Sequence, residues 1–264
     1  MDRKFTGAQE RQAAKLLGDV LTSLNPSKDE LQERVLAAPQ RSALFQRRLH
    51  EVFVVLLARY FGPLTDEEAL AWLMEDAGQA EPEAQRLIAG CRKGASEQGL
   101  ASTVSCHYAV EAGATLKGTI PTLGPCVEDF QYLQGWTFPD NPTEACLVSG
   151  VPSALRETTN QNLEIQLRTL AAIEGRWGIP SGFFSHELVP TVYTAGVALA
   201  HHKVTRHNMF NDLWVRTGSC HADGSRLSLH WGGGQLYCGY WRWGEDGYPN
   251  IAVVALGVTK ALGR

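Results

Sequence analysis

The sequence predicts an α+β protein, with helices in its first part and an antiparallel sheet in its last part. Residues 6–98 show helical periodicity broken by capping and stop signals, whereas residues 213–258 contain four short β-type runs separated by glycine-rich turns. A chain of 264 residues is long enough to bury a sizeable core. We expect a helical region over residues 1–99 and a mixed region over residues 100–264, with a boundary set by composition alone that is also compatible with one domain.

Capping signals define the helices of the first region. Ser27 with Glu30 and Thr65 with Glu68 have the spacing of capping boxes, in which the side chains satisfy the free N–H groups of the first helical turn. Residues 40–60 place their apolar side chains on one broad stripe. This stripe predicts a helix that faces the core.

The composition changes after residue 99, where glycine and proline become frequent. Residues 100–150 are typical of strands and loops, with Val104–Val110 as an expected strand. Ser153–Arg176 has good helical content, and Pro190–Ala200 follows a proline that suits a helix start. We expect these two helices to pack against the terminal sheet.

The last part of the chain has the pattern of a four-stranded antiparallel meander. Its connectors contain Asp223-Gly224, Gly232–Gly234 and Asp246-Gly247, which are strong hairpin signals between apolar and aromatic runs. The four runs cover residues 213–220, 226–231, 235–243 and 251–258.

Charge and hydropathy exclude several classes of function. The net charge is −4, and Thr65–Gly94 is strongly acidic, so we expect no nucleic-acid binding. The longest apolar run, Val52–Ala58, is too short to cross a bilayer, and the first residues lack the apolar core of a signal peptide. The six cysteines include no CxxC pair, which favours reduced thiols in a cytoplasmic protein without a membrane anchor.

No sequence motif indicates a cofactor. The chain has neither a GxxxxGK[ST] phosphate loop nor a strand-GxGxxG-helix unit. The nearest approach to a metal-ligand set is His201, His207 and His221, together with Cys220 and Cys238. Because these residues lack the spacing of known zinc motifs, we expect no metal and rank a zinc-supported site third among the possible functions.

A cysteine nucleophile is the sharper chemical hypothesis. Cys220 follows Thr217, Gly218 and Ser219 and precedes His230, an order similar to the small-Gly/Ser-Cys and downstream His pattern of bacterial glutamine deamidases. This resemblance implies a cysteine-dependent amidohydrolase, with Cys220 as nucleophile, His230 as base and Ser219 or Thr217 donating a hydrogen bond.

The expected strand register places Cys220 and His230 on opposite faces of the sheet. A two-residue turn at Asp223-Gly224 puts Cys220 opposite Leu227 on an apolar face and puts His230 on the polar face, opposite Thr217. A bulge would bring the two residues back to one face. Cys238 is a competitor for His230 if Gly232–Gly234 is a three-residue loop.

Aromatic residues are the strongest compositional anomaly of the terminal sheet. In the third run, Tyr237, Trp241 and Trp243 alternate onto one face, and Arg226 and Arg242 lie nearby in sequence or across the turn. Such a surface suits recognition of a protein or a small planar ligand. We therefore expect first a binding protein that uses these five residues without a cofactor, and second the cysteine enzyme.

Overall fold

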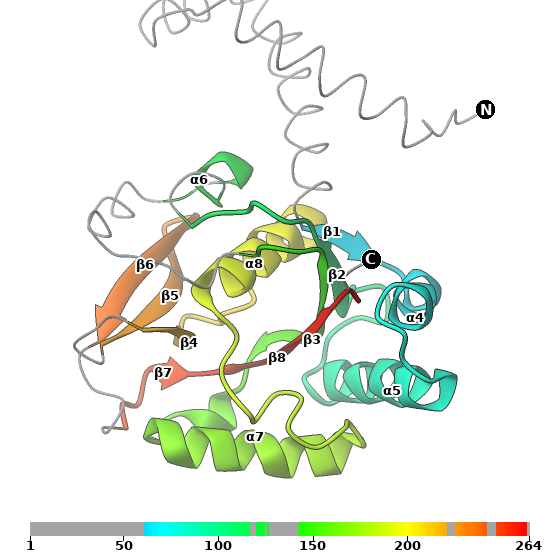
Figure 1. Ribbon diagram of the computed structural model, residues 1–264. Helices are drawn as coiled ribbons and strands as arrows, with labels where there is room; N and C mark the ends of the chain where they lie inside the picture. The colour runs from blue at the N-terminus through cyan, green and yellow to red at the C-terminus, as the bar shows by residue number, and fades with distance from the viewer. Residues whose placement is uncertain are drawn as a thin grey trace, which may run out of the picture. The chain divides into compact units, whose positions relative to one another are not determined.

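The computed structural model describes residues 61–116, 120–124, 126, 142–220, 225–241 and 247–262. Two four-stranded sheets and the helices between and around them form the fold (Figure 1). The α+β class is therefore confirmed. The expected Ser27–Glu30 capping box and the helix over residues 40–60 lie outside the described residues, and the division at residue 99 stays a prediction.

Sheet A contains β1 (Gly62–Leu64), β2 (His107–Val110), β3 (Cys146–Ala154) and β8 (Val254–Lys260), in the order β1-β2-β3-β8. All its neighbouring strands are antiparallel. Helices α4 (Asp66–Glu75), α5 (Glu81–Glu97) and α7 (Leu163–Trp177) cover one face, and a short 3-10 turn, η2 (Arg156–Thr158), follows β3 (Figure 1). Because α4 and α5 share this core with β3 and α7, the described residues before and after position 99 pack together.

Sheet B contains β4 (Trp214–Cys220), β5 (Arg226–Gly232), β6 (Gln235–Trp241) and β7 (Ile251–Ala252), in the order β6-β5-β4-β7. Its inner face packs on α8 (Thr191–Thr205), which also contacts sheet A, while α6 (Ile120–Leu123) packs against α8. Every residue from Thr191 to His201 is buried, as expected for a helix enclosed by two sheets.

The meander is present in β4, β5 and β6, and the fourth run takes a different path. Ile251–Ala252 pairs in parallel with the start of β4, and the chain then enters sheet A, where β8 pairs with β3 (Figure 1). Hairpin signals in the sequence indicate pairing only between strands that follow one another in the chain. The partner of β8 is a distant strand that is buried along its whole length, so hydrophobic burial decides this pairing.

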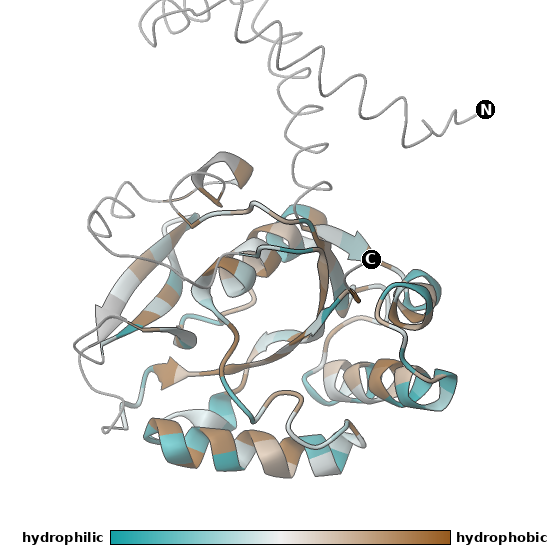
Figure 2. Ribbon diagram, in the orientation of Figure 1, coloured by the Kyte–Doolittle hydropathy of each residue, from teal (hydrophilic) through white to brown (hydrophobic). Residues whose placement is uncertain are grey.

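Local signals place several other elements. The Thr65–Glu68 capping box is confirmed, and the expected strand and helices appear as β2, α7 and α8. Helix α7 begins only at Leu163, because Ser153 still belongs to β3 and Asn162 caps the helix. Apolar residues line β7 and the inner sides of α5 and α7 (Figure 2). In the described part of the chain, none of the helices has the length and apolarity needed to cross a membrane.

Candidate functional site

The strand register does not pair Cys220 with His230. Cys220 pairs with Arg226, because β4 bulges between Arg216 and Cys220, so the expected register opposite Leu227 is wrong. The bulge does place Cys220 on the same side of the sheet as Arg226 and His230. However, Arg226 and His230 are four positions apart on β5, which separates the proposed nucleophile and base by about 13 Å along the strand.

The hydroxyl groups expected to assist Cys220 have another role. Ser219 Oγ accepts a hydrogen bond from the Thr191 N–H at 2.9 Å, and the Thr217 hydroxyl lies 2.5 Å from that of Thr191. Both side chains are buried. They hold the N-terminus of α8 against β4, while Cys220 itself is exposed.

Cys238 does not compete for His230. It pairs with Leu229 on the inner face of sheet B, because Gly232 pairs with Gln235 and only Gly233 and Gly234 form the turn. Burial raises the pKa of the Cys238 thiol well above its usual value. The side chain therefore belongs to the core.

The outer face of sheet B carries a small aromatic cluster, formed by Trp214, His230 and Tyr237. The indole of Trp214 stacks on the imidazole of His230, with ring centroids 5.0 Å apart, and Tyr237 follows at 6.2 Å from His230. A side chain at Gly239 would come within 2.9 Å of the Trp214 ring, so this glycine makes room for the indole. All three rings are half-buried.

Of the other residues predicted for this face, the structure describes the side chain of Arg226. Arg226 donates to the Gly218 carbonyl at 3.0 Å. Trp241 ends β6, but its side chain lies outside the described residues, as do Arg242 and Trp243. The buried Arg216 pairs with Ser228 and donates to Gln166 of α7 at 2.6 Å, so α7 contacts this face between the aromatic cluster and Arg226.

The histidines considered for zinc form no ligand set among the described residues. His201 is buried in α8, and burial lowers its pKa to about 4. His207 follows the end of that helix, and His221 lies outside the described residues. Within the described ranges, no group of three or more His, Cys, Asp or Glu side chains is placed to hold a metal ion.

A partly buried polar network joins β2 and β3 to α4 and α5. His107 Nδ1 is 2.9 Å from the Ser149 hydroxyl, and its Nε2 is 3.7 Å from the Asp66 carboxylate, which forms two hydrogen bonds of 2.7 Å with Arg92. These residue types are those of a serine hydrolase, and no sequence spacing indicated them.

Accessibility argues against catalysis by this network. Ser149 and His107 have no exposed surface, and the 3.7 Å separation is too long for a hydrogen bond between His107 and Asp66. Burial lowers the pKa of His107 to about 4, although the nearby Asp66 opposes this shift. The network therefore ties β2 to β3 and α4 to α5.

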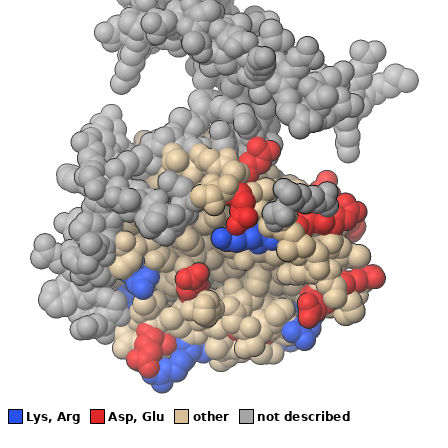
Figure 3. Space-filling model, in the orientation of Figure 1, with Lys and Arg blue, Asp and Glu red and all other residues tan. Residues whose placement is uncertain are grey.

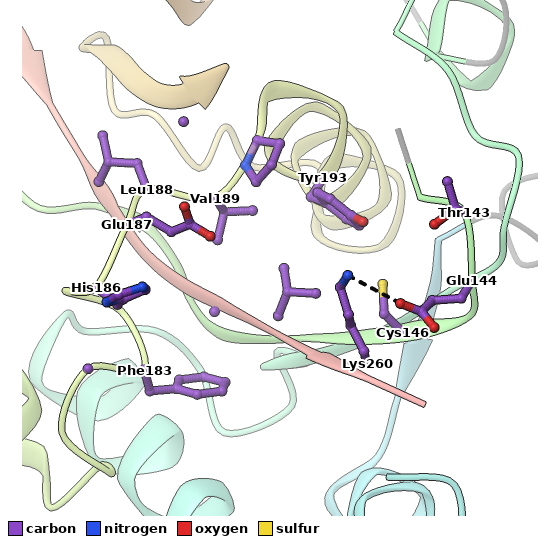
Figure 4. A pocket seen from close by; sticks show the side chains of 15 residues that line it. Thr143, Glu144, Cys146, Phe183, His186, Glu187, Leu188, Val189, Tyr193 and Lys260 are labelled. Carbon is purple, nitrogen blue, oxygen red and sulfur yellow. Dashed lines mark ion pairs between the residues drawn. The ribbon is translucent and has the colours of Figure 1, made fainter. Parts of the chain in front are cut away.

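A groove that the sequence did not indicate runs along β8. It has a volume of about 440 Å³ and lies between β8 and the chain that leads into α8 (Figure 4). At one end Lys260 pairs with Glu144 at 3.2 Å, beneath Tyr193, and at the other end are His186 and Glu187 (Figure 4). Its lining comes from four separate segments of the chain: residues 143–146, 182–193, 218 and 257–260.

The thiol in this groove is not an activated nucleophile. Burial raises the pKa of Cys146 to about 12, and a hydrogen bond with Tyr193 only partly opposes this. The protonated thiol is a poor nucleophile. Cys146 is therefore a lining group of the groove and not its nucleophile.

The groove wall opposite β8 is held by a buried carboxylate. Glu174 of α7 accepts hydrogen bonds from the N–H groups of Gly182, Phe184 and Ser185. Each is a charge-assisted bond, so this one side chain fixes the turn from which His186 and Glu187 extend.

The free edge of β8 faces this groove. Ala261 N–H donates to Ala145 O at 3.1 Å. Because the main-chain groups of every second residue in an antiparallel strand point to the same neighbour, those of residues 257 and 259 also point toward β3. The main-chain groups of Val258 and Lys260 consequently point away from β3. Among the described residues, these groups have no backbone hydrogen-bond partner.

Comparisons of this chain with known protein families, with curated proteins and with solved structures give no match.

Proposed function

We propose that this protein acts by binding a partner protein through the outer face of sheet B. The stack of Trp214 on His230, extended by Tyr237, is the observation that supports this function. Half-buried aromatic rings with fixed positions contribute much of the energy in protein interfaces, because little side-chain entropy is lost on binding. Arg226 adds a cation on the same face, four positions from His230 along β5.

The cysteine enzyme is the less favoured alternative. The strand partner of Cys220 is four residues from His230 along β5, and the Ser219 hydroxyl already accepts a hydrogen bond at the start of α8. Selective alkylation of Cys220 would not by itself support catalysis, because the exposure of this thiol is enough to explain the labelling.

All six cysteines are free thiols, which supports a reducing, cytoplasmic location.

Site-specific photo-crosslinking tests the proposed surface. A photoreactive phenylalanine analogue replaces Tyr237, and the same analogue at Met74, which is 38% exposed on α4, is the control. We expect a protein partner crosslinked from Tyr237 only. The purified partner should then bind the Tyr237→Ala variant at least about tenfold more weakly than the wild type, as for other interface aromatics.

The matched control for affinity is Ile165→Ala, since Ile165 is 42% exposed on α7. Equal affinity of the Tyr237→Ala variant and the wild type would contradict the proposal, and so would equal crosslinking from Tyr237 and Met74.

A further inference from the structure

We propose that the groove along β8 binds an extended peptide segment, which adds to sheet A as a fifth strand. The main-chain N–H and C=O groups of Val258 and Lys260 lie on the same edge, two residues apart. Another extended chain offers donors and acceptors with the same spacing of about 6.6 Å, which a compact ligand does not.

The wall opposite β8 limits the room for an occupant. Val189 and Tyr193 stand across the groove from β8, so a bound chain would lie between this wall and the edge of β8 (Figure 4). The volume of about 440 Å³ is in the range of sites that enclose a small ligand or a few residues of peptide. At Gly257 the groove narrows, because a Cβ there would lie 2.6 Å from the Phe183 carbonyl oxygen. The open edge thus accommodates a short segment.

Charge and apolar contacts define the chemistry of this segment. Two carboxylates, Glu144 and Glu187, line the groove against one ammonium group, Lys260. Glu144 is paired with Lys260, whereas Glu187 is exposed and has no hydrogen-bond or ion-pair partner among the described residues. The peptide should therefore carry Lys or Arg next to Glu187 and an apolar residue against Val258.

A random heptapeptide library displayed on phage is the probe. Selected peptides are synthesised with blocked ends, and their dissociation constants are measured by fluorescence anisotropy. Val258→Pro removes the N–H that points into the groove and leaves the bonds between β8 and β3 in place, as proline does on edge strands. We expect at least about tenfold weaker peptide binding to this variant, and unchanged binding to the control Thr259→Val.

Two further measurements make the result independent of the proline substitution. N-methylation at alternate peptide residues should abolish binding, while N-methylation of the intervening residues should not, since only every second residue bonds to the edge. Glu187→Gln should weaken binding of cationic peptides several-fold, with a loss that shrinks at high salt.

The Tyr237→Ala variant should bind these peptides like the wild type, so this test is separate from that of sheet B. Failure to enrich peptides on the wild type over Val258→Pro would overturn the proposal. Insensitivity to N-methylation would also overturn it, and so would self-association of the protein that Val258→Pro abolishes.

Discussion

Gly218 occupies the bulge of β4, where the chain passes close to the segment before α8. Its N–H donates to Val189 O at 2.8 Å, and a Cβ at this position would lie only 1.9 Å from Leu188 O. Since the contacting atom belongs to the backbone, it cannot swing aside as a side chain does. The bulge therefore requires glycine.

We expect Gly218→Ala to lower the free energy of unfolding by about 3 kcal/mol, as other overpacked substitutions do. Gly175→Ala is the control, because a Cβ at Gly175 on α7 meets no atom within 4 Å and should raise stability by up to about 1 kcal/mol. Urea unfolding measures both. If the Gly218→Ala variant were as stable as the wild type, the segment before α8 would have to move away from the added methyl group, and the requirement for glycine would be contradicted.

Two buried histidines make the stability of the protein dependent on pH. Burial lowers the pKa of His107 and of His201 to about 4. Because the unfolded chain binds these protons near pH 6.5, stability is complete above that pH and falls as the pH decreases toward 4. The loss is at most about 3 kcal/mol for each histidine.

Replacing His107 by Gln, which does not take up a proton in this range, should reduce the fall in unfolding free energy between pH 6.5 and 4. The exposed His186 supplies the control, and His186→Ala should retain the wild-type profile. Parallel profiles for His107→Gln and the wild type would refute the assignment of this pH dependence to His107.

At the scale of single elements, helix α4 depends on its capping box. Thr65 Oγ1 accepts from Glu68 N–H at 3.2 Å, and the Glu68 carboxylate accepts from Thr65 N–H at 2.9 Å. We expect Thr65→Ala to lower the free energy of unfolding by about 1 kcal/mol. Thr65→Ser keeps a hydroxyl at the cap and should retain most of the wild-type stability. Equal stabilities of these two variants in thermal unfolding would mean that packing alone fixes the start of the helix.

Elements with local signals were predictable, and those with distant partners were not. The Thr65 box and the turn at Gly233 depend on residues close in sequence. The split of the last run into β7 and β8 depends on β3, about a hundred residues earlier. The bulge at Gly218 had no signal in the sequence, because it accompanies a contact with Val189, which is distant in sequence.

Across the whole molecule, the class of the fold was predictable but the groove was not. Hydrophobic periodicity and turn residues indicated helices and an antiparallel sheet. By contrast, Glu144, Glu187 and Lys260 share no pattern in the sequence and line one groove only because distant segments of the chain pack together. The acidic side chains gathered over α4, visible in Figure 3, follow from composition directly.

The pairing of β3 with β8 sets the order of events during synthesis of the chain. Cys146 faces Lys260 and Val148 faces Val258, so β3 emerges from the ribosome long before its neighbour exists. Until then, a fully buried strand and the helices that cover it have no complete sheet to join. Strands β1 and β2 precede β3 and can pair with it as soon as it emerges, whereas the other edge of β3 stays open until residues 254–260 have left the ribosome, and sheet A is completed only then.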